Sequence, residues 1–217
     1  MQFLAIFKVL DTDMSESTQK KEQISLERNT KETQINLTLN LYGSGTSDIQ
    51  TGIGFFNHML EAFSKHSLID LKLICKGDLE VDMHHSVEDC GIALGGALHK
   101  AIFPVQNIER FGNASVVMDE ACVSCDIDIS NRAFLLFDMQ AAQNGFYGKV
   151  GEFDVELVEE FFRALVMQAG ISTHIVLQRG KNLHHIIEAA FKAFAVSLRR
   201  AMTKNASIQI PSTKGCL

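Results

Sequence analysis

The sequence lacks the features that mark several large classes of protein. It has no long run of Lys or Arg, and its formal net charge is −6, so we do not expect nucleic acid or an anionic membrane as its main partner. No stretch approaches the about 20 apolar residues of a membrane-spanning helix. The opening MQFLAIFKVLDTD contains no small-residue cleavage site of the kind that follows a secretory signal.

Cysteine is too scarce, and odd in number, to support a disulfide framework. Five cysteines in 217 residues instead fit a reducing cytoplasm. Cys122 and Cys125 form a single C-x-x-C without a second pair, in a segment that alternates apolar and polar residues. We therefore expect strand packing for this pair rather than a redox or zinc role.

The N-terminal 23 residues differ from the rest. The segment MSESTQKKEQ, residues 14–23, is polar, so we expect residues 1–23 to be a flexible extension, and Met14 is an alternative start. The remaining chain is long enough, and at 46% hydrophobic residues apolar enough, to bury a substantial core.

An internal repeat organises this remaining part. Residues 82–98 (DMHHSVEDCGIALGGAL) and 182–198 (NLHHIIEAAFKAFAVSL) stand one hundred positions apart and share the pattern His-His-x-x-Glu. Both segments have small and apolar residues at helical spacing and neither contains proline. Each is therefore predicted to be a helix that begins at its histidines.

The segments before these helices correspond as well. Residues 55–74 align with 157–176, each as a helix followed by a strand, and this alignment places His58 opposite Glu160. Strand-like sequence lies further upstream, at residues 33–42, 114–129 and 134–139.

The repeat predicts an α+β fold of duplicated half-domains, each a small mixed β-sheet with two helices packed on one face. The first half-domain is expected at 24–110 and the second at 111–217, with a connection near 103–112. The helices should gather to form the core, so that the two halves make one compact unit.

The spacing of the repeated residues suits metal ligands. On a helix of about 100° per residue, His84 and Glu88 share one face while His85 points away, so adjacent histidines serve two centres more easily than one. With one partner from each preceding helix, the candidate ligands are His58, His84, His85, Glu88, Glu160, His184, His185 and Glu188. This mixed nitrogen and oxygen set without thiolate suits Mn²⁺, Fe²⁺ or Zn²⁺, with octahedral Mn²⁺ preferred.

A simpler interpretation is that these residues are polar helix starts with surface or capping histidines. It would be preferred for a single His pair, but repetition of the whole pattern argues against it. His66, His99 and His174 have no repeat partner, and we expect packing or surface roles for them. A zinc peptidase would need H-E-x-x-H, an order that neither segment has.

Further motifs occur in order along the chain: RNTKET (28–33), TGIGFFNHML (51–60), GDLEVDMHHSVEDCGIALG (77–95), RFG (110–112), MDEA (118–121), DISNR (128–132), EEFF (159–162), GKNLHHIIEAAFKA (180–193) and IPSTKG (210–215). Together they resemble the imidazoleglycerol-phosphate dehydratase family over about residues 24–217. The resemblance implies half-domains similar to ribosomal protein S5 domain 2, and a C-terminal tail that binds substrate. It also implies assembly of trimers into a 24-subunit cage, with two Mn²⁺ ions in each active site at subunit interfaces.

The resemblance also implies residue roles. Substrate contacts are expected from Glu32, His58, Arg110, Arg132, Lys192, Ser212, Thr213 and Lys214. The guanidinium, ammonium and hydroxyl groups in this set suit a phosphate because all donate hydrogen bonds to its oxygens. Glu32 is the candidate acid/base, with Glu88 and Glu188 as the next candidates.

The reaction implied is loss of water from D-erythro-imidazole-glycerol phosphate, giving imidazole-acetol phosphate in L-histidine biosynthesis. Metal bound to the imidazole nitrogens would stabilise an imidazolate and then a diazafulvene-like intermediate. Two other functions stay open on the residues alone. One is a dinuclear metal hydrolase that releases inorganic phosphate, and the other is a metal-storage or structural-metal cage.

Some positions depart from the family's usual pattern. Glu160 stands where many members carry His, which makes that metal shell more anionic. Pro is often found where Val117 and Ala133 stand, Gly in place of Asn131, and Asp in place of Asn57. None of these changes removes a candidate ligand.

Overall fold

The computed structural model describes residues 7–8 and 23–214. Most of the predicted N-terminal extension, including Met14, lies outside the described residues. The elements follow in the order β1 (Phe7–Lys8), β2 (Gln23–Asn29), β3 (Thr33–Asn40), β4 (Ser47–Gln50), α1 (Gly54–Ser67), β5 (Asp70–Gly77), α2 (His84–Ile102), β6 (Phe111–Met118), β7 (Ala121–Asp128), β8 (Phe134–Asp138), β9 (Lys149–Val150), β10 (Phe153–Asp154), α3 (Leu157–Ala169), β11 (Ser172–Arg179) and α4 (Leu183–Ala201).

The two mixed sheets repeat the same strand topology. The first has the order β1-β2-β3-β5-β4 and the second β6-β7-β11-β8, while β9 and β10 form a separate ribbon. In each sheet an antiparallel hairpin, β2–β3 or β6–β7, is extended by an antiparallel strand. A parallel edge strand follows, β4 beside β5 and β8 beside β11. The predicted α+β fold with duplicated halves is therefore confirmed.

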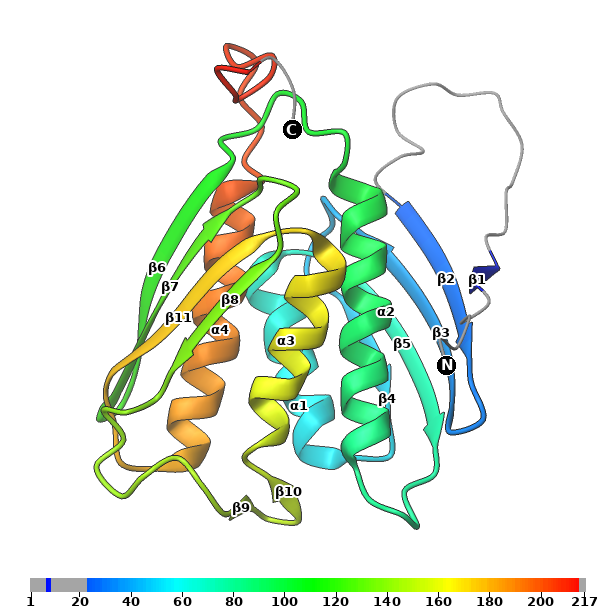
Figure 1. The fold of residues 1–217 in the computed structure, drawn as a ribbon, viewed down its shortest axis with the longest axis vertical. Helices are drawn as coiled ribbons and strands as arrows, with labels where there is room; N and C mark the ends of the chain where they lie inside the picture. Colours follow the sequence, from blue (N-terminus) through cyan, green and yellow to red (C-terminus); the bar gives the residue numbers. More distant parts are fainter. Residues whose placement is uncertain (1–6, 9–22, 215–217) are drawn as a thin grey trace.

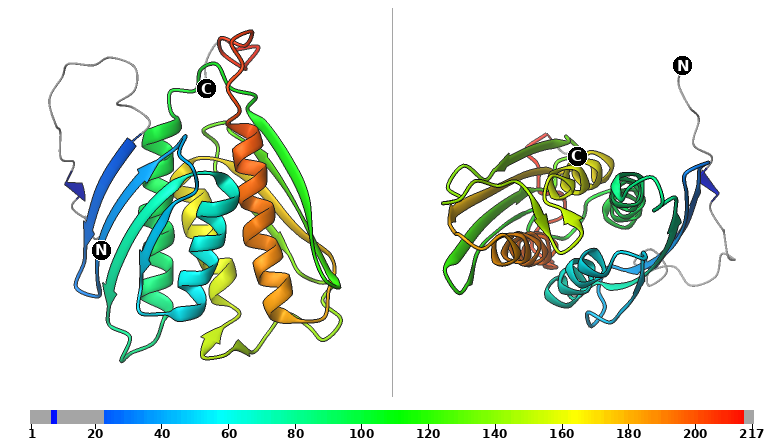
Figure 2. Two further views of the ribbon diagram at one scale, coloured as in Figure 1. Left: turned by 180° about the vertical axis from the view of Figure 1, so that it is seen from behind. Right: turned by 90° about the horizontal axis from the view of Figure 1, so that it is seen from below.

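All four long helices lie between the two sheets (Figures 1 and 2). The halves meet helix to helix, since α2 packs mainly on α3 and α1 on α4. Buried phenylalanines fill this contact: the rings of Phe56 and Phe161 are 5.3 Å apart, and those of Phe63 and Phe194 are 6.0 Å apart. Burial of each such ring stabilises the fold by about 1.5–3 kcal/mol, so the predicted helical core joins the halves.

Two glycines bring α2 and α3 close together. A Cβ at Gly91 would lie 2.7 Å from the carbonyl oxygen of Phe161, and one at Gly95 would lie 2.3 Å from that of Leu165. Both distances are shorter than real Cβ contacts. The absence of a side chain at these two glycines therefore allows α2, which carries His84, His85 and Glu88, to lie close to α3, which carries Glu160.

The four helices begin at the same end of the molecule (Figure 1), which we call the helix-start end. Candidate ligands in the first two turns of these helices are thereby gathered at this end. The segment after α4, residues 202–214, lies at the opposite end, beside the connection between α2 and β6 (Figure 1). In the part of the chain that the structure describes, no helix is both long and apolar enough to cross a membrane.

Candidate metal centre

A polar residue at the same repeat position, Asp82 or Asn182, precedes each His pair. The side chain of Asp82 accepts a hydrogen bond from the backbone N of His84 at 2.7 Å, and that of Asn182 accepts one from His184 at 2.9 Å. Both hydrogen bonds satisfy an amide group that the first turn of a helix leaves free. Asn182 is the N-cap of α4, whereas Met83 is the N-cap of α2. Helix α2 begins at His84, as predicted, and α4 begins at Leu183, one residue before its histidines.

Three predicted ligands meet at the helix-start end. One ligand atom each from His58, His184 and Glu188 lies within 4.8 Å of the others. Oε2 of Glu188 is 3.4 Å from Nε2 of His58 and 3.1 Å from Nε2 of His184. We call these residues the 58/184/188 cluster. Two imidazole nitrogens and a carboxylate oxygen form a donor set that suits a divalent transition metal.

Glu188 is held ionised within this cluster. Its side chain is only 8% exposed, and Nζ of Lys192 lies 2.7 Å from its other oxygen, Oε1. Burial opposes ionisation, but the hydrogen bond and charge of Lys192 outweigh it and lower the pKa of Glu188. Lys192, predicted to bind phosphate, thus contacts a candidate metal ligand here and leaves Oε2 directed at the histidines.

The corresponding set of the first half is less complete. His84 Nε2 lies 3.9 Å from Glu88 Oε2, so the two do share a helix face as predicted. Glu160 on α3 is half-buried. Among the described residues, only the 58/184/188 cluster brings three possible ligands together, so the structure does not gather Glu160 with His84 and Glu88.

The second histidine of each pair is oriented by a carboxylate. Nδ1 of His85 lies 3.0 Å from Asp78, and Nδ1 of His185 lies 2.7 Å from Glu120. A carboxylate on Nδ1 fixes the ring and leaves Nε2 as the free ligand atom, as in carboxylate–histidine–metal sites. Asp78 raises the pKa of His85, and the hydrogen bond from His185 lowers the pKa of Glu120 to about 2.

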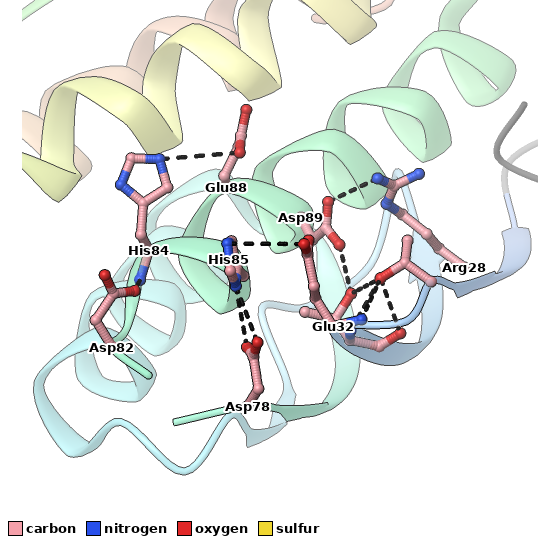
Figure 3. A network of polar contacts seen from close by, with 10 residues as sticks. Arg28, Glu32, Asp78, Asp82, His84, His85, Glu88 and Asp89 are labelled. Carbon is pink, nitrogen blue, oxygen red and sulfur yellow. Dashed lines mark hydrogen bonds and ion pairs between the residues drawn. The ribbon is translucent and has the colours of Figure 1, made fainter. Parts of the chain in front are cut away.

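Asp78 and Glu120 were not predicted from the sequence as partners of these histidines. A signal was present for Glu120, which directly precedes the second strand of the β6–β7 hairpin as Glu32 does in the β2–β3 hairpin. Glu32 itself approaches the other side of its histidine: Oε1 is 3.9 Å from Nε2 of His85 (Figure 3).

The predicted phosphate-binding residues lie mainly at the opposite end. Arg110 donates to Asp128 at 2.7 Å and to the carbonyl oxygen of Pro211 at 2.7 Å, so it holds the tail against the second sheet. Arg132 is 72% exposed, and its Nη2 lies 3.7 Å from the same aspartate. The tail continues through Ser212, Thr213 and Lys214. Within one chain these groups are together but remote from the 58/184/188 cluster.

Several predicted packing residues behave as expected. Cys122 and Cys125 lie buried and free in β7. His99 is half-buried with its ring 4.7 Å from that of Phe103, and His174 is exposed on the outer face of β11. None of these residues is part of the metal-ligand geometry.

Comparison with known proteins identifies the family. The model of the imidazoleglycerol-phosphate dehydratase family matches residues 51–198, a span that holds all eight candidate ligands. The chain belongs to the imidazoleglycerol-phosphate dehydratase family. It is 66% identical to imidazoleglycerol-phosphate dehydratase of Helicobacter hepaticus, over 91% of this chain and 97% of that protein. It is 64% identical to that of Campylobacter hominis, over 88% of this chain and 97% of that protein.

Solved structures of the family share the fold. Imidazoleglycerol-phosphate dehydratase from Staphylococcus aureus superposes with a TM-score of 0.74 at 41% identity, covering 83% of this chain and 98% of that one. The Pyrococcus furiosus protein gives a TM-score of 0.74 at 35% identity, covering 88% of this chain and 99% of that one. The duplicated arrangement of sheets and helices is thus that of the dehydratase family.

Proposed function

We propose that this chain is an imidazoleglycerol-phosphate dehydratase, a metal-dependent hydro-lyase of L-histidine biosynthesis. It would convert D-erythro-imidazole-glycerol phosphate to imidazole-acetol phosphate. The observation that carries the proposal is the 58/184/188 cluster, a metal-type donor set made from both halves of a chain of this family. The cluster contains no thiolate, which favours metals that accept nitrogen and oxygen ligands.

Mn²⁺, two ions in each active site, is the metal that we propose. The residues that would hold the ions are His58, His84, His85, Glu88, Glu160, His184, His185 and Glu188. When bound, the ions supply positive charge that lowers the pKa of the substrate imidazole and makes loss of the neighbouring hydroxyl easier.

The side chains of this protein would supply proton transfer and orientation. Glu32 would take the proton from the carbon beside the departing hydroxyl, so that the C–H and C–O bonds break, water leaves and the resulting enol becomes the ketone. Its exposed carboxylate beside His85 supports this role. Glu88 and Glu188 are the alternative bases, although Glu188 is already engaged by Lys192.

The phosphate would be held by Arg110, Arg132, Lys192, Ser212, Thr213 and Lys214, with His58 and Glu32 nearer the imidazole and the carbon chain. Donors of this kind fix a phosphate by charge-assisted hydrogen bonds and so orient the reacting carbons.

A complete site would need more than one subunit. Helix α4 has 19 residues, which corresponds to a length of about 28 Å, and it separates the 58/184/188 cluster from Arg110 and the tail. A small substrate cannot span that distance. We therefore propose that the tail end of one subunit reaches the helix-start end of another, in trimers that assemble into a 24-subunit cage.

The remaining proposals concern the cellular location, the partners and the domain organisation. We place the protein in the cytoplasm, with neither nucleic acid nor membrane as a partner. We also retain the division into half-domains 24–110 and 111–217, with residues 1–23 as an extension.

A product assay tests the proposed reaction. The purified protein is incubated with D-erythro-imidazole-glycerol phosphate and Mn²⁺, and imidazole-acetol phosphate and inorganic phosphate are both measured. Formation of imidazole-acetol phosphate without release of phosphate is expected. Release of phosphate would instead indicate a metal hydrolase, and metal binding with no product would indicate a storage or structural role.

A further inference from the structure

The hairpin that carries Glu32 is tied to helix α2 by a buried ion pair (Figure 3). Nη2 of Arg28, on β2, lies 2.6 Å from Oδ1 of Asp89, and their side chains are only 11% and 9% exposed. The other oxygen of Asp89 accepts a hydrogen bond from the hydroxyl of Thr33, the first residue of β3. Asp89 therefore binds both strands of the hairpin, close to the turn that joins them.

The turn itself is fixed from both sides of Glu32. Oγ1 of Thr30 accepts hydrogen bonds from the backbone N of Glu32 at 3.1 Å and of Thr33 at 2.9 Å. The carbonyl oxygen of Glu32 accepts one from the backbone N of Asp78 at 3.1 Å. Asp78 is the residue that orients His85, so the backbone of Glu32 is connected to the support of this histidine.

The side chain of Glu32 depends on this backbone support. It is 53% exposed, and Oε1 lies 3.9 Å from Nε2 of His85. Asp89 follows Glu88 on α2, the same helix that presents His84 and His85. The network thus links the proposed base to the helix that bears candidate metal ligands.

The second half shows that folding alone does not require such a network. The hairpin residue equivalent to Thr33 is Ala121, the first residue of β7, and the helix residue equivalent to Asp89 is Ala189. Both alanines are fully buried and apolar. In that half α4 packs on β7 with apolar residues at both of these positions, and the hairpin glutamate, Glu120, binds His185 instead.

We propose that Asp89, together with Arg28, Thr30 and Thr33, is a positioning network that holds Glu32 at the reacting carbon. This inference rests on the proposed function, in which Glu32 is the base. Buried ion pairs are often no more stabilising than apolar side chains of the same volume, whereas paired charges and hydrogen bonds fix direction. A displacement of about 1 Å at a reacting group can lower a rate by about 10²-fold.

A double-mutant cycle tests this role. Thr33→Val removes the hydroxyl that binds Asp89 and keeps the volume, and it is made in the wild type and in Glu32→Gln. We expect turnover to fall by about 10-fold or more in the wild type, with unchanged KM and metal content, and no further fall in Glu32→Gln, because residues that act as a unit are not additive. Thr38→Val, on the outer face of the same strand, is the matched control and should retain turnover.

A second pair of variants guards against a folding defect in Thr33→Val. Thr30 is only half-buried, and Thr30→Val should lower turnover while Thr30→Ser, which keeps the hydroxyl, restores it. Equal losses from Thr33→Val in both backgrounds, or no loss from Thr33→Val or Thr30→Val in the wild type, would overturn the positioning role. Near-normal turnover of Glu32→Gln alone would instead refute Glu32 as the base.

Discussion

His58 and Glu188 belong to different halves of the chain, yet Nε2 of His58 lies 3.4 Å from Oε2 of Glu188. The contact exists because α1 packs on α4 across the core, with both helices beginning at the same end (Figure 1). Metal binding at this cluster would therefore depend on the packing of the two halves as well as on the ligands themselves.

The first prediction is that His58→Ala lowers bound metal, because a ligand nitrogen is lost from the 58/184/188 cluster. Metal affinity should fall by about 10-fold or more, measured by competition with a chelator and by elemental analysis. His66→Ala is the matched control on the same helix and should keep its metal. Equal metal affinity in both variants would remove His58 from the ligand set.

The repeat made much of this site predictable. Because the His-His-x-x-Glu pattern occurs twice, one hundred positions apart, sequence alone indicated where both helices begin and paired His84 with Glu88. It could not show that His58 joins the α4 residues rather than those of its own half, since that depends on how the halves pack. Asp78 was missed because it lies in a loop, where no periodic pattern marks it, whereas Glu120 could have been found from its match to Glu32 at the start of a hairpin's second strand.

The fold was predictable where the pattern was strong. The helices and the strands β3 and β8 followed from apolar spacing, but β2 and β4 were not predicted, and β6 and β7 were expected as one stretch at 114–129. Ser47–Gln50 has a single apolar residue and is stabilised by its pairing with β5. The position of Arg110 relative to the candidate metal ligands could not be predicted from the sequence either. Motif order along a chain does not say which ends of the molecule the motifs occupy.

The second prediction concerns phosphate binding by Arg132, whose side chain is largely exposed and weakly paired. Arg132→Ala should raise KM for the phosphorylated substrate by about 10- to 100-fold, with metal content unchanged. This increase corresponds to the loss of about 1.5–3 kcal/mol of binding free energy from a charged hydrogen bond. Arg163→Ala, which removes another exposed arginine paired within its own helix, is the control. Loss of metal from Arg132→Ala would show that the division of roles is wrong.

The third prediction tests the close contact of α2 with α3. Gly95→Ala should lower the free energy of unfolding by about 1–3 kcal/mol, because the new Cβ meets backbone that cannot move freely. A Cβ at the neighbouring Gly96 would lie 3.7 Å from its nearest neighbour, so Gly96→Ala should be neutral or stabilising by up to about 1 kcal/mol. Denaturant unfolding of both variants makes the comparison, and similar effects would contradict close packing at Gly95.

The fourth prediction concerns pH and Asp70, whose Oδ1 accepts hydrogen bonds from the backbone N of Ser44 at 2.8 Å and of Thr46 at 2.9 Å. Burial opposes ionisation, but these hydrogen bonds outweigh it and lower the pKa of Asp70 below its usual 3.8. Because the pKa of Asp70 is lower in the folded than in the unfolded protein, ionised Asp70 stabilises the fold at pH values above the unfolded-state pKa. This stabilisation is lost as the pH falls through the folded-state pKa.

Asp70→Asn should therefore lower Tm relative to the wild type by a constant amount between pH 7 and pH 5. The difference should shrink only below about pH 3.8, the ordinary aspartate range. Thermal melting across this range measures it. A difference that already disappears between pH 7 and pH 5 would point to a histidine rather than to Asp70.

The most direct test of the proposed dehydratase is turnover by metal-stripped protein. Stripped protein, verified as metal-free by elemental analysis, is assayed for imidazole-acetol phosphate before and after Mn²⁺ is added, with His66→Ala and His58→Ala treated alongside. We predict no turnover without metal, recovery with Mn²⁺ for the wild type and His66→Ala, and impaired recovery for His58→Ala. Full turnover by the verified metal-free protein would contradict a metal-dependent dehydration at this site.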